Sequence, residues 1–287
     1  MGVIRDQMID ECVRRGLSER TIRAYVGQAS LFARAHGRSP DQLGRDEVRA
    51  YLLRLTKLGR APATVRQVHS ALRFLYVKVL DRPAVVEGIP LPKVRNKLPV
   101  VPSRAEVVRL LDACTNPFDR AFFMTAYAAG LRLSEVLHLQ AANIRSDLGV
   151  LWVRHGKGDK DRQVMLDPLL LDTLRRHWRD SRLPGPWLFP ARDTRRFAID
   201  PWRDRPVHPT TMQKRLRLRC AEAGLGRLTV HSLRHAFATH LLEDGVDVRT
   251  LQVLLGHSQL DTTMRYLRIE PSQVGNIPSP LRNLDPS

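Results

Sequence analysis

Cysteine is scarce in this sequence, and a long apolar run is absent. The three cysteines, Cys12, Cys114 and Cys220, lie far apart and form no CxxC pair, which argues against a structural disulfide and a cysteine zinc site. No apolar stretch approaches the roughly 20 residues that a helix needs to span a bilayer. Residues 1–16 lack the continuous apolar segment of a signal peptide. We therefore expect a cytoplasmic protein without a membrane partner.

Acidic residues are also few relative to basic ones. The chain of 287 residues carries 29 Asp and Glu against 47 Lys and Arg, which leaves a net charge of +18. Arginine dominates the excess, and its planar guanidinium suits two-pronged contacts with phosphate. This charge predicts a nucleic-acid partner; the alternative is a basic surface that only favours solubility. The length is sufficient for two modest domains.

The N-terminal part of the sequence predicts an all-helical domain over residues 1–84. Apolar side chains recur at helical spacing in four segments, which are residues 8–16, 17–37, 46–59 and 61–80. Ser18 and Asp46 are the candidate N-caps, and Gly37 and Gly59 are the candidate stops.

The next segment, 85–102, is rich in proline and has no hydrophobic period, so we expect an extended linker there. A capping box of Ser103 and Glu106 begins a second domain, expected over 103–270. The prolines of residues 271–287 predict a loosely ordered tail.

Within the second domain, most segments have helical spacing, and one has the pattern of a hairpin. The β-rich runs VLWV (150–153) and QVML (163–166) flank a turn of Gly, Lys and Asp. The predicted fold class is mainly α with a small β-hairpin or sheet, in two domains: one all-helical, the other mixed α/β.

Three segments of the second domain carry candidate chemistry. In TVHSLRHAFATHLLEDG, His231, Arg234 and His235 share one helix face. That face is either solvated or functional; a metal site is disfavoured, because no HExxH pattern or acidic partner accompanies the histidines. In GLRLSE, Arg132 lies between two helices, where it could bind an oxyanion or cap carbonyls with Glu135 as a surface partner.

The third segment, HGKGDKDR, places Lys157 at the hairpin tip, where it could donate a proton within a groove or simply be an exposed turn lysine. It does not match the GxxxxGK[ST] phosphate-binding loop. Further on, LLGHSQLDTTMRYLRI contains His257 in a turn after Gly256, and then Tyr266. Alone, such a tyrosine is usually a packing residue, and a phenol with a pKa near 10 needs assistance to act as a nucleophile.

Taken together and in order, GLRLSE, HGKGDKDR, HSLRHAFATHLL, LLGHS and Tyr266 resemble the motifs of the tyrosine recombinase (phage integrase) family. The resemblance covers most of residues 103–269, and the N-terminal helices resemble the family's core-binding domain. The segment before WLFP is too short for the insertion of integron integrases, which disfavours an integron role.

The resemblance implies a role for each matching residue. Arg132 and Arg234 would hold the scissile phosphate, with Glu135 orienting Arg132. Lys157 would protonate the leaving 5′ oxygen and His231 would act as acid/base on the tyrosine hydroxyl. The two remaining catalytic positions are His257, which would bind the phosphate, and Tyr266, the nucleophile.

The implied activity is site-specific DNA cutting and rejoining through a 3′-phosphotyrosine, with no metal, ATP or other cofactor and no small-molecule substrate. The implied partners are a double-stranded DNA site, of a mobile element or of a chromosome, and a homotetramer that exchanges C-terminal tails. When bound to DNA the protein would be associated with the nucleoid. Arg66 and Arg217 are candidate DNA contacts. The alternatives are a non-cutting DNA-binding regulator with the same fold and a type IB topoisomerase-like relaxing activity.

Overall fold

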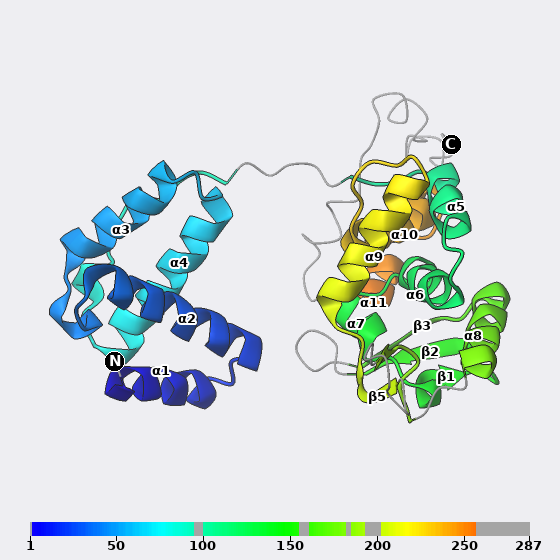
Figure 1. Cartoon of the computed structure of the whole chain (residues 1–287), viewed down its shortest axis with the longest axis horizontal. Coiled ribbons are helices and arrows are strands. Elements are labelled where there is room, and N and C mark those ends of the chain that lie inside the picture. The colour runs from blue at the N-terminus through cyan, green and yellow to red at the C-terminus, as the bar shows by residue number, and fades with distance from the viewer. Residues whose placement is uncertain (1, 95–99, 155–160, 182–184, 193–201, 257–287) are drawn as a thin grey trace, which may run out of the picture. The chain divides into compact units, whose positions relative to one another are not determined.

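A computed structural model describes residues 2–94, 100–154, 161–181, 185–192 and 202–256 of the chain. The chain divides into two compact units, Met1–Lys97 and Leu98–Ser287 (Figure 1). The predicted fold class is confirmed: the chain is mainly helical, with small sheets in the second unit. The bounds proposed for the domains, linker and tail stay predictions.

The first unit is helical throughout its described residues. Its elements are α1 (Gly2–Arg14), α2 (Glu19–His36), α3 (Arg45–Lys57), α4 (Pro62–Phe74) and a π-helical turn (Leu75–Val79). The Ser18 side chain accepts the Thr21 amide at the start of α2, as predicted. The prediction that Asp46 caps α3 is wrong. Gly44 occupies the cap, because the Glu47 carboxylate accepts the Gly44 amide at 2.9 Å and thereby fixes the start two residues earlier.

Aromatic rings occupy the centre of this first unit. Phe32 meets Tyr51 and Tyr76 edge-on, with ring centroids 5.2 and 6.5 Å apart. Tyr76 is fully buried, and its hydroxyl donates to the Pro40 carbonyl at 2.8 Å, which satisfies the only polar atom of that side chain. The unit therefore has a core of its own, made where α2 and α3 pack on α4.

The second unit surrounds one central helix. Its helices are α5 (Arg104–Asp112), α6 (Pro117–Ala128), α7 (Leu133–Leu137), α8 (Pro168–Ser181), α9 (Pro209–Glu222), α10 (Val230–Glu243) and α11 (Val248–Leu255). Helix α6 packs against α5, α7, α8, α9 and α10. Its Phe122 and Phe123 are fully buried, because almost every side of α6 is covered.

Two antiparallel sheets accompany these helices. One has the order β1 (Ile144–Arg145), β2 (Val150–Val153), β3 (Arg162–Met165), and the other pairs β4 (Pro190–Arg192) with β5 (Trp202–Pro206). The predicted hairpin is present, and Val153 lies opposite Arg162 at the last pair before the connecting loop. Among the described helices, none combines the length and apolarity that crossing a membrane demands.

Candidate active site

Arg132 is placed by the turn between α6 and α7. Gly130 has φ +58° there, and a Cβ on it would lie 2.3 Å from the ring of Phe237, so only glycine fits. The turn sets Arg132 at the N-cap of α7, with its side chain 24% exposed. The carboxylate of Glu135, one turn on, accepts both the Arg132 amide and its Nη1, each at 2.7 Å.

Arg234 reaches the same place from α10. Its side chain is only 1% exposed, and its Nη1 donates to the Gly130 carbonyl at 2.7 Å. Nη2 donates to the Leu255 carbonyl at 2.5 Å, and Glu135 lies 3.7 Å from Nη1. The solvated-face alternative is therefore wrong for Arg234: this guanidinium is a buried charge held by carbonyls and a carboxylate.

Glu135 is the anion at the centre of this cluster, and its side chain is 4% exposed. A third arginine, Arg162 of β3, donates to both of its oxygens at 2.8 Å. Burial by itself would raise the pKa of Glu135, but the hydrogen bonds and charge of Arg162, followed by the hydrogen bonds of Arg132, outweigh it and lower the pKa to about 2. Glu135 is thus ionised at neutral pH and is a buried anchor rather than a surface partner.

Glu135→Gln is expected to lower the free energy of unfolding at pH 7 by on the order of 3 kcal/mol, since each pKa unit corresponds to about 1.4 kcal/mol. A carboxyl whose pKa is depressed by folding stabilises above its unfolded pKa, 4.5, and loses that contribution as the pH falls towards about 2. Urea unfolding between pH 7 and pH 3 checks this: the difference from wild type should shrink by about 2 kcal/mol. A constant difference would contradict it. Glu19→Gln, whose side chain is 90% exposed, is the control with little effect.

His231 begins the same face of α10, one turn before Arg234. It is exposed, and its ring meets that of His235 edge-on with centroids 4.2 Å apart. Desolvation by the surrounding protein lowers the pKa of His231, and the charges of Arg234 and Arg132 lower it further. The neutral imidazole therefore predominates at pH 7 and can accept a proton.

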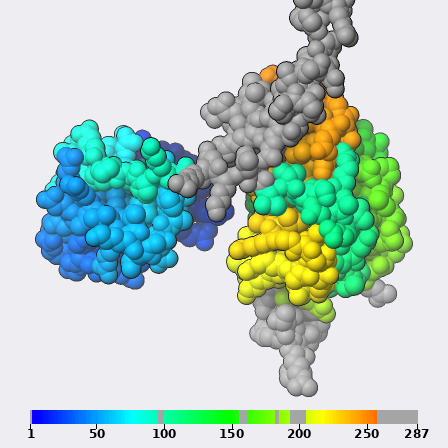
Figure 2. Space-filling model, turned by 90° about the horizontal axis from the view of Figure 1, so that it is seen from above, coloured from blue at the N-terminus to red at the C-terminus, as the bar shows by residue number. Residues whose placement is uncertain are grey.

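The structure describes only some of the other predicted site residues. Lys157, His257 and Tyr266 lie outside the described residues. Arg66 is exposed on α4 of the first unit. Arg217 is exposed on α9, which forms part of the surface of the second unit (Figure 2). The described ranges contain no group of three or more His, Cys, Asp or Glu side chains that could hold a metal ion.

Sequence reasoning missed Arg162. It is the last residue of the quoted motif HGKGDKDR, but its contacts are with Glu135 and the Leu254 carbonyl, 27 and 92 residues away. No local pattern indicates those contacts.

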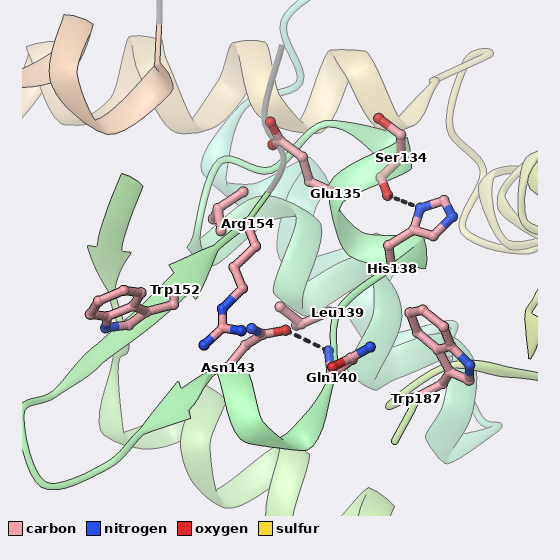
Figure 3. Close-up of a pocket in the computed structure, with 10 residues that line it drawn as sticks. Ser134, Glu135, His138, Leu139, Gln140, Asn143, Trp152, Arg154 and Trp187 are labelled. Carbon is pink, nitrogen blue, oxygen red and sulfur yellow. Dashed lines mark hydrogen bonds between the residues drawn. The ribbon is translucent and has the colours of Figure 1, made fainter. Parts of the chain in front are cut away.

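A cavity of about 600 Å³ lies beside α7 (Figure 3). Trp152 and Arg154 contribute to it from the end of β2. His138 and Trp187 also line it, and their rings meet edge-on with centroids 5.9 Å apart. Among the predicted site residues that the structure describes, only Glu135 lines it, and its carboxylate is occupied by the arginines described above. The arginine cluster, rather than this cavity, therefore defines the candidate active site.

The chain is similar to known proteins over almost its whole length. Residues 103–273 match the phage integrase family, and residues 4–85 match the N-terminal SAM-like domain of phage integrases. An integrase/recombinase of Sinorhizobium fredii is 43% identical over 99% of this chain and 90% of its own length. The tyrosine recombinase XerA of Pyrococcus horikoshii is 34% identical over 88% of this chain and 85% of its own length.

A solved structure shows the likeness of fold. The crystal structure of a lambda integrase(75-356) dimer bound to a COC′ core site matches with a TM-score of 0.71, over 94% of this chain and 99% of that one, at 18% identity. The chain therefore belongs to the phage integrase family and is an enzyme of the tyrosine-type site-specific recombinase class.

Proposed function

We propose that this enzyme cuts and rejoins double-stranded DNA at specific sites through a 3′-phosphotyrosine formed on Tyr266. The observation that supports it most is the placement of Arg132 and Arg234 against one buried carboxylate, Glu135. Attack on a phosphodiester concentrates negative charge on the nonbridging oxygens, and fixed guanidiniums stabilise that charge without reorganising. In this proposal both arginines bind the scissile phosphate, and His257 adds a third contact to it.

The proton transfers fall to His231 and Lys157. The Tyr266 oxygen attacks phosphorus while the bond from phosphorus to the 5′ oxygen breaks. His231 takes the phenolic proton, which its lowered pKa permits at pH 7. Lys157 donates a proton to the departing 5′ oxygen. On the acid side, the adduct-forming rate should then fall only below the ordinary histidine pKa of about 6.5, which a single-turnover pH series checks.

The intermediate keeps the energy of the broken ester in the phosphotyrosine bond. A free 5′ hydroxyl from another strand can attack it and restore a phosphodiester, so strand exchange requires no ATP, metal or other cofactor. DNA is then the substrate and small molecules are not. The excess of Lys and Arg, which gives the net charge of +18, suits this polyanion, and Arg66 and Arg217 are proposed backbone contacts. We place the enzyme in the cytoplasm, at the nucleoid when bound.

Exchange between two duplexes requires four active sites, so we propose a homotetramer on paired sites in which neighbours exchange their C-terminal tails. Truncation after Ile269 should leave binding to a single site unchanged and reduce the pairing of two sites several-fold. Gel-shift titration measures both. Recombination at the wild-type rate by the truncated chain would contradict tail exchange.

Covalent trapping tests the proposed activity itself. The purified enzyme is incubated with the DNA that flanks its gene, denatured with detergent, and the attached DNA is recovered and sequenced at its ends. We expect protein-bound 3′ ends at one recurring sequence. A regulator that does not cut yields no attached DNA, and a relaxing activity of the topoisomerase type yields attached ends without a preferred site.

A further inference from the structure

The C-terminal end of α11 is held by three arginines at once. The last carbonyl oxygens of a helix have no amide of a following turn to accept from, and those of residues 254–256 lie at this end of α11. Arg162 Nε donates to the first at 2.8 Å, Arg234 Nη2 to the second at 2.5 Å and Arg132 Nη2 to the third at 3.3 Å. The negative end of the helix dipole favours such cations.

The same three arginines also surround Glu135. Arg162 binds it with two parallel hydrogen bonds of 2.8 Å, Arg132 binds it at 2.7 Å, and Arg234 lies within 3.7 Å. One carboxylate and one helix end therefore fix the positions of both proposed phosphate-binding arginines. Any movement of Glu135 relative to α11 would move both guanidiniums.

Arg162 uses its whole guanidinium to hold Glu135 and the end of α11. All three of its guanidinium nitrogens donate, one to the Leu254 carbonyl and two to Glu135, and its side chain is 7% exposed. Arg132, by comparison, is 24% exposed. Arg162 also does more than Arg132 to lower the pKa of Glu135. The geometry of Arg162 suits holding Glu135 in place rather than binding DNA.

Arg162 also lies close to the segments that contain two other proposed catalytic residues. It begins β3, five residues after Lys157, and it contacts the residues that directly precede His257. Gly256 permits the approach: it has φ +61°, and a Cβ on it would lie 2.9 Å from Arg162 Cδ. One side chain thus joins the segments that lead to two proposed catalytic residues.

We propose that Arg162 is a positioning residue of the catalytic centre, which acts through Glu135 and the end of α11 to hold Arg132 and Arg234 in the geometry that the cleavage step requires. This inference rests on the proposed function. It predicts that loss of the two-pronged contact slows the chemical step without weakening DNA binding.

The test compares wild type with Arg162→Lys. Lysine keeps the positive charge but cannot make the two parallel hydrogen bonds to Glu135. The control is Arg145→Lys, an exposed arginine of the same sheet that pairs with Asp147. Adduct formation is measured in single turnover at saturating DNA, and affinity is measured by gel shift. We expect a rate about 10- to 100-fold lower for Arg162→Lys, with affinity within about twofold of wild type and no change for the control. Thermal unfolding confirms that each variant is folded at the assay temperature.

A double-mutant cycle separates positioning from a general structural effect. If Arg162 acts through Glu135, adding Arg162→Lys to Glu135→Gln should lower the rate by less than about threefold further. The proposal would be overturned if the double variant loses the product of the two single fold-losses, as independent residues do. It would also be overturned if the single Arg162→Lys variant cleaves as fast as wild type. A wild-type enzyme that forms no adduct overturns the proposed function and this inference together, whereas an active wild type with an equally active Arg162→Lys variant overturns this inference alone.

Discussion

Tyr266→Phe is expected to abolish covalent attachment to DNA while affinity for the site stays within about twofold of wild type. The phenolic oxygen is the atom that bonds to phosphorus in the proposed reaction, and the phenyl ring offers no replacement nucleophile. Binding instead depends on the many phosphate contacts of a strongly basic chain, which this change leaves intact.

The measurement uses a nicked suicide substrate, on which cleavage releases a short strand and so prevents religation. Adducts are counted on a denaturing gel, and affinity is measured by gel shift. Tyr25→Phe is the control, because its ring packs on Phe74 in the first unit and that contact survives the change. An adduct formed by Tyr266→Phe at a rate near that of wild type would show that another residue is the nucleophile.

Arg132→Ala and Arg234→Lys are each expected to lower the rate of adduct formation at saturating DNA by about 10²- to 10³-fold, the cost of removing one fixed donor from a developing oxyanion. Arg132 is partly exposed, so its truncation should leave the fold largely intact. Lysine at position 234 keeps the charge but cannot reach the carbonyls of Gly130 and Leu255 together, since it lacks the planar fork.

The control for these arginine variants is Arg176→Ala on α8, an exposed arginine paired with Asp172. It removes one positive charge outside the cluster, so it should leave the cleavage rate unchanged. A variant at 132 or 234 that cleaves within threefold of wild type would remove that arginine from the phosphate site.

Local signals in the sequence predicted the elements that local contacts control. Ser18 and Ser103 cap their helices through side-chain contacts three residues away, so short motifs identify them. The prediction for Asp46 failed because the cap at Gly44 depends on a hydrogen bond from the Gly44 amide to the Glu47 carboxylate. N-cap propensities of single residues do not predict that contact. The short strand β1 was also missed, since two residues carry no readable period.

The active-site cluster was predictable only in part. The sequence pattern placed Arg234 on a helix face and Arg132 in a turn, but not the carboxylate that joins them. That junction requires β3, α7 and the end of α11 to meet, and Arg162 and Leu254 are separated by 92 residues. Contacts over such separations depend on tertiary packing, so the role of Arg162, and the joining of Arg132 to Arg234 through Glu135, emerged only from the structure.

The most direct test of the account is the chemical identity of the covalent link. The wild-type adduct on a suicide substrate is digested with nuclease and protease, and the nucleotide-bearing peptide is sequenced by mass spectrometry. If Tyr266 is the nucleophile, the peptide carries a 3′-phosphonucleotide on Tyr266 in the segment TTMRYLRI. A nucleotide attached to any other residue, or through its 5′ phosphate, would contradict it.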